Sequence, residues 1–313
     1  MRLTPNLYLV ATLVVSPALA GDLAYVTCQN SDALQVLDIE LGKDGRQWEV
    51  PGQPAGVAVA ENAVFTVAAG DKSVRKHDPH TGRVLYENRL DGGPMGVAYD
   101  PSRDRLFVSD WYNARIWVLN GADLARLQVL DVGAAPAGLA ISEDGRFLAS
   151  ADRDADQVSL FDADTLTLLH SIPVGSRPFG LRFAPDGRLF VGNVGSDDIS
   201  IIDPDHGKLK RMVAVGARPY GVAFAQQRAF ITNQYADTLS VIDLDTLATI
   251  ATLETGEYPE GVDASSDGKH IAVANWFENS MTVFDAATLS VLHTIDTCDG
   301  PRAFGNFLMG GNK

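Results

Sequence analysis

Residues 178–203 read PFGLRFAPDGRLFVGNVGSDDISIID, and this stretch decides the fold of the whole chain. Its apolar residues recur at every second position, which is the pattern of β-strands half buried against a neighbouring layer. The strands that we expect from this pattern are residues 179–183, 189–192, 199–202 and, just beyond the stretch, 208–215. Asp186-Gly187 is typical of a hairpin turn, because Gly accepts a positive φ. The stretch therefore predicts one small antiparallel sheet of four strands.

The same unit recurs along the chain with a period of about 41 residues. Its first landmark is Pro-x-Gly-[Val/Leu], which begins at Pro54, Pro94, Pro136, Pro178, Pro219 and Pro259, and at Pro301 with Ala303 in place of Gly. Its second landmark ends the third strand 18 residues before that Gly or Ala, at Asp38, Asp78, Asn120, Asp162, Asp203, Asp243 and Asp285. We expect the carboxylates to accept hydrogen bonds from their own turns. Seven such sheets predict an all-β, seven-bladed β-propeller with four antiparallel strands per blade.

The two ends of the chain each carry part of one further unit. Residues 24–27 match a second strand, whereas residues 301–308 match a first strand. We expect the N-terminal strands to pair with the C-terminal strand, because the closed ring then leaves no exposed strand edge. The propeller would span residues 21–313 as a single domain.

Residues 1–20 have the features of a signal peptide. Arg2 supplies the positive charge, residues 7–15 the apolar core, and Ala18-Leu19-Ala20 the small-residue cleavage site. We therefore predict a periplasmic protein that is exported by a cleaved signal peptide. No later stretch reaches the roughly 20 apolar residues that a membrane-spanning helix needs, so we expect no membrane span.

Charge and missing motifs exclude several classes of function. The formal net charge of −15 repels phosphate backbones, so we expect no nucleic-acid partner. The sequence contains no haem-attachment motif, phosphate-binding loop, nucleophile elbow or Ser-His-Asp spacing. The close histidine pair, His77 and His80, flanks a turn, and we interpret both residues as solvated. We assign no catalytic residue, no metal ligand and no cofactor.

The second strands of several copies share a short motif. They read Tyr25-Val26-Thr27, Phe230-Ile231-Thr232-Asn233 and Ile271-Ala272-Val273-Ala274-Asn275. This pattern resembles the YVTN family of β-propeller repeat proteins over essentially the whole mature chain. The resemblance implies a small periplasmic seven-bladed propeller, and some similar propellers are associated with quinoprotein dehydrogenase systems. The motif is specific for the fold but says little about chemistry, because propellers host many functions.

Function is expected where the copies differ, because a residue present in every blade is most simply part of the scaffold. Antiparallel order places the loop before each first strand and the loop after each second strand on one face, around the mouth of the central channel. The candidate binding residues there are Arg177, Phe179, Arg218, Tyr220, Tyr235, Tyr258, Glu260, Trp276, Phe277 and Arg302, with Trp111 and Tyr112 across the ring. The arginines would give a positive, aromatic-lined mouth for a planar anion or a carboxylate-rich patch of a partner. Alternatively, each arginine pairs with a nearby carboxylate and each aromatic covers a blade edge.

The two cysteines fall in the blade that joins the chain ends. Cys28 follows a second strand, where Asn is expected, and Cys298 takes the place of a Gly before a first strand. Both positions lie on the mouth face, so we predict a disulfide that joins the two ends of the chain. Two buried thiols are the alternative.

Three functions remain open from the sequence. The leading hypothesis is a non-enzymatic periplasmic binding or docking protein that engages a small planar anionic ligand or another periplasmic protein, such as a redox or quinoprotein system. The main rival is a lactonase-like propeller hydrolase or lyase, whose carboxylates would be Asp110, Asp152 and Glu260. Asn193 or Asn233 would help those carboxylates to hold a divalent ion. The third is a structural envelope or assembly protein.

Overall fold

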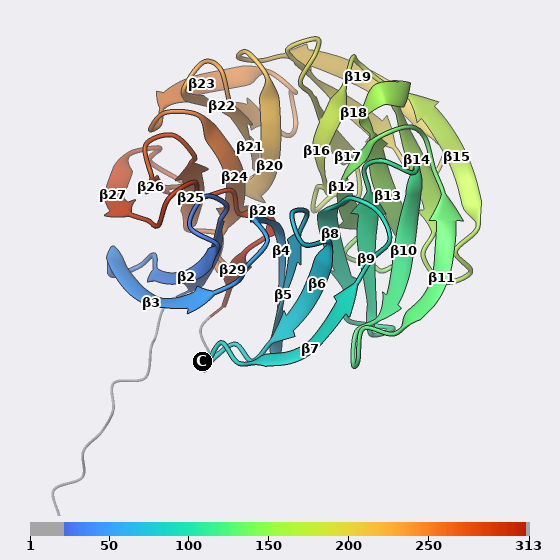
Figure 1. Cartoon of the computed structure of the whole chain (residues 1–313). Coiled ribbons are helices and arrows are strands. Elements are labelled where there is room, and N and C mark those ends of the chain that lie inside the picture. Colours follow the sequence, from blue (N-terminus) through green and yellow to red (C-terminus); the bar gives the residue numbers. More distant parts are fainter. Residues whose placement is uncertain (1–21, 311–313) are drawn as a thin grey trace, which may run out of the picture.

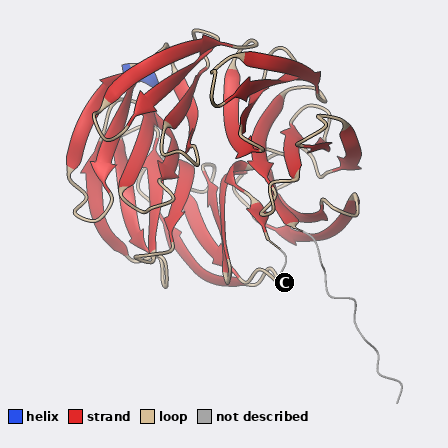
Figure 2. Ribbon diagram, turned by 180° about the vertical axis from the view of Figure 1, so that it is seen from behind, coloured by secondary structure: helices blue, strands red, loops and turns tan. Residues whose placement is uncertain are grey.

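The computed structural model describes residues 22–310, in which seven small antiparallel sheets stand around a central axis (Figure 1). Five of the sheets consist of four strands that are consecutive in sequence, and the other two also take a strand from the C-terminal end. The view from behind shows strands throughout and one turn of 3-10 helix, η1 (Arg153–Ala155) (Figure 2). No helix in this described part is long and apolar enough to cross a membrane. The predicted seven-bladed propeller is confirmed, and the predicted signal peptide lies outside the described residues.

Within each blade the strands are arranged in order from the central channel outward. The inner strands are β4 (Pro54–Ala60), β8 (Pro94–Asp100), β12 (Pro136–Ile141), β16 (Pro178–Phe183), β20 (Pro219–Ala225) and β24 (Pro259–Ala264), with β28 (Phe304–Asn306) and β29 (Leu308–Met309) at the C-terminal end. The second strands are β1 (Leu23–Cys28), β5 (Ala63–Ala68), β9 (Arg105–Asp110), β13 (Phe147–Asp152), β17 (Leu189–Asn193), β21 (Arg228–Asn233) and β25 (His270–Asn275).

The two outer positions of each blade complete the sheets. The third strands are β2 (Ala33–Asp38), β6 (Ser73–His77), β10 (Arg115–Asn120), β14 (Gln157–Asp162), β18 (Asp198–Asp203), β22 (Thr238–Asp243) and β26 (Ser280–Asp285). The outermost strands are β3 (Lys43–Glu49), β7 (Val84–Arg89), β11 (Arg126–Asp131), β15 (Leu168–Pro173), β19 (Lys208–Ala214), β23 (Thr249–Glu254) and β27 (Val291–Asp296). The core lies between blades: one cluster joins Phe190 and Ile201 of one blade to Val222 and Ile231 of the next.

The closest contact between blades is made by the Gly of Pro-x-Gly. A Cβ atom added to this Gly would lie closer than 3.0 Å to a backbone carbonyl oxygen of the next inner strand, at Gly56, Gly96, Gly138, Gly180, Gly221 and Gly261. Real Cβ atoms do not come so close, so only Gly lets the inner strands approach each other at this point. The recurring Gly is therefore a requirement of ring packing.

Side-chain hydroxyls connect the same backbones at several blade interfaces. Thr232 Oγ1 accepts the N–H of Gly221 at 2.8 Å in its own blade and donates to the carbonyl of Glu260 at 2.8 Å in the next. Ser109 makes the equivalent pair of bonds, to Gly96 at 2.8 Å and Ala137 at 2.7 Å. At these interfaces the bonds fix one inner strand relative to the next, and with it the residue between Pro and Gly.

The ring closes as expected, with one additional pairing. β29 pairs antiparallel with β1, and the N–H of Arg302 donates to the carbonyl of Thr27 at 2.8 Å. β28, however, pairs in parallel with β4 of the neighbouring blade. Gly305 allows this parallel pairing, because its φ is +131° and a Cβ at this position would collide with the carbonyl oxygen of Val57. The C-terminal segment thus holds two blades together.

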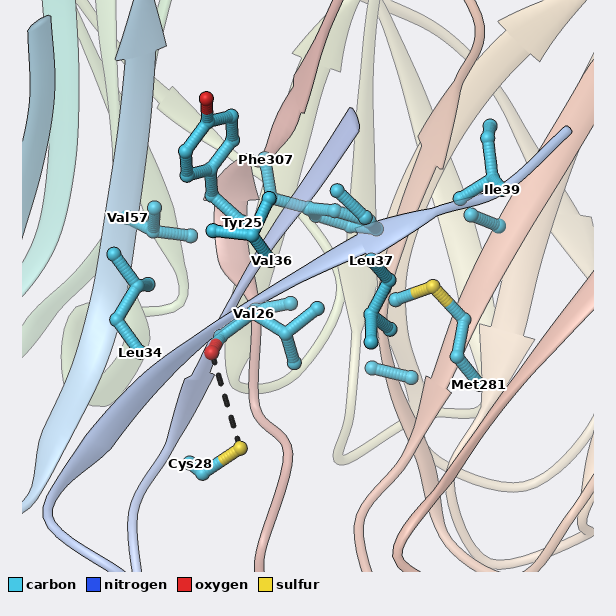
Figure 3. Close-up of a cluster of buried hydrophobic side chains, with 14 of the residues drawn as sticks. Tyr25, Val26, Cys28, Leu34, Val36, Leu37, Ile39, Val57, Met281 and Phe307 are labelled. Atoms are coloured by element: carbon cyan, nitrogen blue, oxygen red, sulfur yellow. Dashed lines mark hydrogen bonds between the residues drawn. The ribbon is translucent and has the colours of Figure 1, made fainter. Parts of the chain in front are cut away.

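Asp263 and an apolar cluster fix this closing segment. Asp263 Oδ2 accepts the N–H groups of Phe307 at 2.8 Å and Leu308 at 3.0 Å, while its Oδ1 accepts from Arg182 at 2.6 Å. Phe307 is completely buried in the cluster that contains Tyr25 and the strands of the closing blade (Figure 3). Both ends of the chain are therefore anchored in the described structure.

Five of the landmark carboxylates accept hydrogen bonds from the backbone of their own turns, as predicted, whereas Asp203 contacts the side chains of His206 and Lys210 instead. Asp162 Oδ1 accepts the N–H of Asp164 at 3.0 Å and of Thr165 at 2.7 Å. These hydrogen bonds, the one from the Thr165 backbone above all, lower the pKa of Asp162. Recurring Asp residues of this kind are thus explained by the scaffold alone.

The interpretation of His77 as a solvated residue is wrong. Its ring is completely buried and stacks on Trp48, with a centroid separation of 6.4 Å, and its Nε2 lies 2.9 Å from Thr66 Oγ1. Burial lowers the pKa of His77 to about 4, so the ring is neutral at physiological pH. Its apolar neighbours come from another blade, which local sequence does not reveal. His80 remains exposed on its turn.

We expect Gly180→Ala to destabilise the propeller by about 3 kcal/mol, because the new methyl group would overlap the carbonyl oxygen of Tyr220. Gly187→Ala is the matched control: its φ of +86° costs about 1 kcal/mol for Ala, but nothing lies within 4 Å of the added Cβ. Urea unfolding of both variants measures the difference. Equal losses would show that the inner strands do not need this contact.

Candidate functional site

The loops before the inner strands and after the second strands surround a hollow of about 340 Å³ at one end of the channel. We call it the mouth hollow, and its lining is Met95, Trp111, Arg153, Phe179, Arg218, Tyr220, Gln234, Tyr258, Glu260, Trp276 and Arg302. Eight of the twelve candidate residues chosen from the sequence are in this lining. The other four, Arg177, Tyr235, Phe277 and Tyr112, are exposed residues outside it.

At five of the seven recurring Pro residues, an Asp or Asn side chain of the preceding blade holds the residue before the Pro. Arg218 has φ +55°, and its N–H donates to Asp197 Oδ1 at 2.8 Å. Tyr258 has φ +61°, and its N–H donates to Asp237 Oδ1 at 2.8 Å. The same bond, always between residues 21 apart, joins Asp32 to Gln53, Asp156 to Arg177 and Asn279 to Gly300. A positive φ is costly for residues other than Gly, so these bonds stabilise the turns that position the side chains.

The floor of the mouth hollow is aromatic. The ring of Phe179 lies 4.4 Å from that of Tyr220 and 5.2 Å from that of Phe304, between ring centroids. All three are buried, so Phe179 and Tyr220 are floor residues rather than the exposed loop aromatics that the sequence suggests. Below them a channel cavity of about 120 Å³ is lined by the inner strands, and Glu260 is the residue that borders both spaces.

Arg302 is neutralised inside the protein. Its Nε donates to Glu260 Oε2 at 2.7 Å, and its terminal nitrogens reach the Tyr220 hydroxyl at 2.9 Å and Gln29 Oε1 at 3.1 Å. Burial raises the pKa of Glu260, although the guanidinium of Arg302 acts in the opposite direction. Local pairing therefore accounts for Arg302, and it adds no net positive charge to the mouth.

Arg218 differs from the other arginines of the mouth. It makes no ion pair and no side-chain hydrogen bond with any residue of the described range, and its Nε is buried. Its guanidinium carbon lies 4.2 Å from the centroid of the Tyr235 ring. Arg153 also lines the hollow but is paired with Asp154 at 2.6 Å. Arg218 is thus the cation of the lining that has no ion-paired carboxylate among the described residues, although its charge opposes the rise in the pKa of Glu260 that burial causes.

Gln234 contributes an acceptor without a partner. Its Nε2 donates to Glu260 Oε1 at 2.6 Å, which fixes the orientation of the amide. Its Oε1 is buried and receives no hydrogen bond from the described residues, although the side chain is only 3% exposed. Sequence reasoning missed Met95, Arg153 and Gln234. Gln234 lies directly after Asn233, in the same loop as the candidate Tyr235, and its position beside an aromatic residue of a mouth loop is the only sequence signal that points to it.

An aromatic rim continues the hollow outward over two blades. The ring of Tyr258 lies 5.4 Å from Tyr235, 5.7 Å from Trp276 and 4.7 Å from Phe277. Tyr235 is 57% exposed and Phe277 60% exposed. The structure therefore brings these four residues together, whereas Tyr112, which is 79% exposed, lies in the loop between β9 and β10 of another blade.

The three carboxylates of the rival enzymatic function do not meet. Asp110 accepts hydrogen bonds from the N–H of Gly93 at 2.9 Å and from Arg115 Nε at 2.7 Å, in its own blade. Asp152 accepts from Ser150 and Ser159, and its burial raises its pKa. Neither lines the mouth hollow with Glu260, and no metal-binding group of three His, Cys, Asp or Glu residues occurs in residues 22–310. Asp110 and Asp152 are parts of the blade scaffold.

A disulfide joins Cys28 and Cys298 beside the mouth, with their Cα atoms 5.7 Å apart and 270 residues between them in sequence. Four residues later the same segment supplies Arg302. Closing so long a loop restricts the unfolded chain and contributes about 3 to 5 kcal/mol in the entropic model. The bridge thus ties ring closure to the position of Arg302.

Two family models match the sequence in overlapping parts. A model described as YNCE-like β-propeller matches residues 186–307, and a model described as lactonase, seven-bladed β-propeller, matches residues 93–225. Both models describe β-propellers, in agreement with the seven-bladed fold of the structure. Each model covers less than half of this propeller, so neither carries a chemistry over to it. No curated protein matches the sequence.

Solved structures of the same fold are similar to this propeller over most of its length. Kuenenia stuttgartiensis hydrazine synthase is 18% identical over 90% of this chain and 100% of that chain, with a TM-score of 0.77. A functionally unknown protein from Desulfotomaculum acetoxidans is 14% identical over 89% and 98%, with a TM-score of 0.76. The dihydro-heme d1 dehydrogenase NirN in complex with DHE is 16% identical over 94% and 76%, with a TM-score of 0.66. At these identities the likeness establishes the fold alone.

We expect Asp197→Ala to lower the free energy of unfolding by about 1 kcal/mol, because the N–H of Arg218 loses its acceptor across the blade interface. Asp197→Asn should retain most of the stability, since Asn279 makes the equivalent bond to Gly300. Urea unfolding of the two variants makes the comparison. A similar loss in both would mean that this bond does not hold the turn.

Proposed function

We propose that this propeller is a binding protein whose mouth hollow recognises a small planar anion. The observation that carries the proposal is Arg218, a cation without a counter-charge among the described residues, in an aromatic hollow of a chain with a net charge of −15. An unpaired guanidinium in a partly buried place is costly unless an anion binds there. A ligand that supplies the missing negative charge would remove that cost.

The size and the walls of the mouth hollow suit a small flat molecule. Its volume of about 340 Å³ is near the lower end of ligand-binding pockets, roughly 300 to 1,000 Å³. Trp111, Tyr258 and Trp276 give it aromatic walls. Aromatic groups stack against flat ligands with a stabilisation of about 0.5 to 1.5 kcal/mol beyond the burial of their area. The walls and the charge therefore favour the same kind of ligand.

Binding explains the hollow better than hydrolysis or elimination does. A general base needs a carboxylate that is free to take up a proton from the substrate. Both oxygens of Glu260 already accept hydrogen bonds, from Gln234 and from Arg302. Asp110 and Asp152 are held within their own blades. The lactonase-like function would need a different arrangement of these carboxylates.

We further propose that the protein acts in the periplasm, where an oxidising environment maintains disulfides such as Cys28–Cys298. The exposed rim of Tyr235 and Phe277 would then contact whatever delivers or receives the ligand, since exposed aromatic clusters favour protein contacts. A redox or quinoprotein partner is one candidate for this contact.

We expect native mass spectrometry of protein purified from its own compartment to show a retained small molecule. Returning that molecule to ligand-free protein should change the tryptophan emission, because Trp111 and Trp276 line the hollow. Trp276→Phe should reduce the change, whereas Trp48→Phe, in a blade core, should leave it intact.

The proposal fails if the purified chain is empty and its emission does not respond to the small-molecule extract of the same compartment. An empty chain that copurifies with another protein would instead favour docking through the aromatic rim.

A further inference from the structure

We propose that the ligand of the mouth hollow is an aromatic carboxylic acid that also carries an N–H or O–H donor. Its carboxylate would bind the guanidinium of Arg218, and its donor would bind Oε1 of Gln234. This inference rests on the proposed function and specifies the ligand for the same site.

The charge and geometry of the hollow indicate that the ligand carries a carboxylate. A planar guanidinium binds a carboxylate or a phosphate through two parallel hydrogen bonds. Arg218 is the only unpaired cation of the lining, because Arg302 is neutralised by Glu260 and Arg153 by Asp154, both within the described residues. One positive charge balances a singly charged carboxylate but leaves a phosphate monoester with excess negative charge close to Glu260. The site therefore favours a carboxylate.

The side chain of Gln234 indicates that the ligand also carries a hydrogen-bond donor. Its Nε2 is committed to Glu260, so the amide cannot turn around to offer a donor in place of its oxygen. The remaining Oε1 is a buried acceptor without a partner among the described residues. Leaving such an acceptor unpaired is unfavourable, and a site built to hydrogen-bond a ligand group discriminates strongly against an analogue that lacks it. The ligand should therefore present an N–H or O–H group at this point.

The aromatic lining of the hollow indicates that the ligand contains an aromatic ring. Two aromatic pairs line the hollow: the rings of Tyr258 and Trp276 lie 5.7 Å apart, and the ring of Trp111 lies 6.0 Å from that of the floor residue Phe179. A flat ring placed between them would be covered by aromatic surface while its polar substituents reach Arg218 and Gln234. Aliphatic acids of the same charge would lack this contact.

The structure contains a matched control for Arg218. Arg177 occupies the same turn in the preceding blade, with φ +54° and the same backbone bond, from its N–H to Asp156 Oδ1 at 2.7 Å. It is exposed and does not line the hollow. Gln53 occupies the equivalent turn elsewhere with φ +59°, so Arg→Gln is compatible with the backbone at both positions.

Isothermal titration with indole-3-carboxylate and indole-3-carboxamide tests the carboxylate. The wild-type protein should bind the acid at least about tenfold more tightly than the amide, the expected gain for hydrogen bonds to a charged group. Arg218→Gln should abolish this preference, and Arg177→Gln should retain it. A preference that survives Arg218→Gln would overturn the assignment. Unchanged unfolding midpoints of both variants show that the turn is intact.

Titration with 1-methylindole-3-carboxylate tests whether the ligand needs an N–H donor, and titration with 4-hydroxybenzoate tests a second aromatic acid that carries a donor. The methylated acid should bind about tenfold more weakly than the parent acid, because it offers no N–H to Gln234. Equal affinity would contradict the role of Gln234. If neither indole-3-carboxylate nor 4-hydroxybenzoate binds while native mass spectrometry shows another retained molecule, this inference fails and the proposed function stands. If the native protein is also empty, both fail.

Discussion

The close approach of neighbouring inner strands is the constraint on which this structure depends. At each Pro-x-Gly the backbone passes so near to the next blade that a Cβ would overlap a carbonyl oxygen. Hydroxyls such as that of Thr232 then bridge the two backbones. Because these contacts fix inner strands against their neighbours, the positions of the mouth residues depend on contacts between blades. The Cys28–Cys298 bridge and Asp263 close that ring at its ends.

The contacts between neighbouring blades also explain why the mouth can carry Arg218 without an ion-paired carboxylate. At most of the recurring Pro residues, the residue before the Pro has a positive φ and its N–H donates to an Asp or Asn side chain of the preceding blade, as at Arg218, Tyr258 and Gly300. Arg218 is therefore positioned by the scaffold and does not need a carboxylate partner to fix it. Glu260 and Arg302, in contrast, neutralise each other through their ion pair at the floor of the hollow. Arg302 thus has a structural role in the hollow, and the binding role that we propose falls to Arg218.

The blades could be predicted because their signals are local: alternating strands, Asp-Gly turns and the recurring Pro-x-Gly all lie within one unit. The mouth could be predicted only as a set of loops. Arg177 and Arg218 occupy identical places in the repeat, yet only Arg218 lines the hollow. The neutralisation of Arg302 depends on Glu260, from a different blade, and the burial of His77 depends on Trp48 in the same way. No pattern within a unit records such contacts.

We propose that Arg218 is the anion receptor of the mouth hollow, and a crystal structure with bound indole-3-carboxylate tests this role most directly. We expect the carboxylate on the guanidinium of Arg218, the ring beside Tyr258 and Trp276, and the indole N–H on Gln234 Oε1. An acid bound elsewhere on the propeller, or an Arg218 side chain that pairs with a protein carboxylate in the crystal, would contradict it.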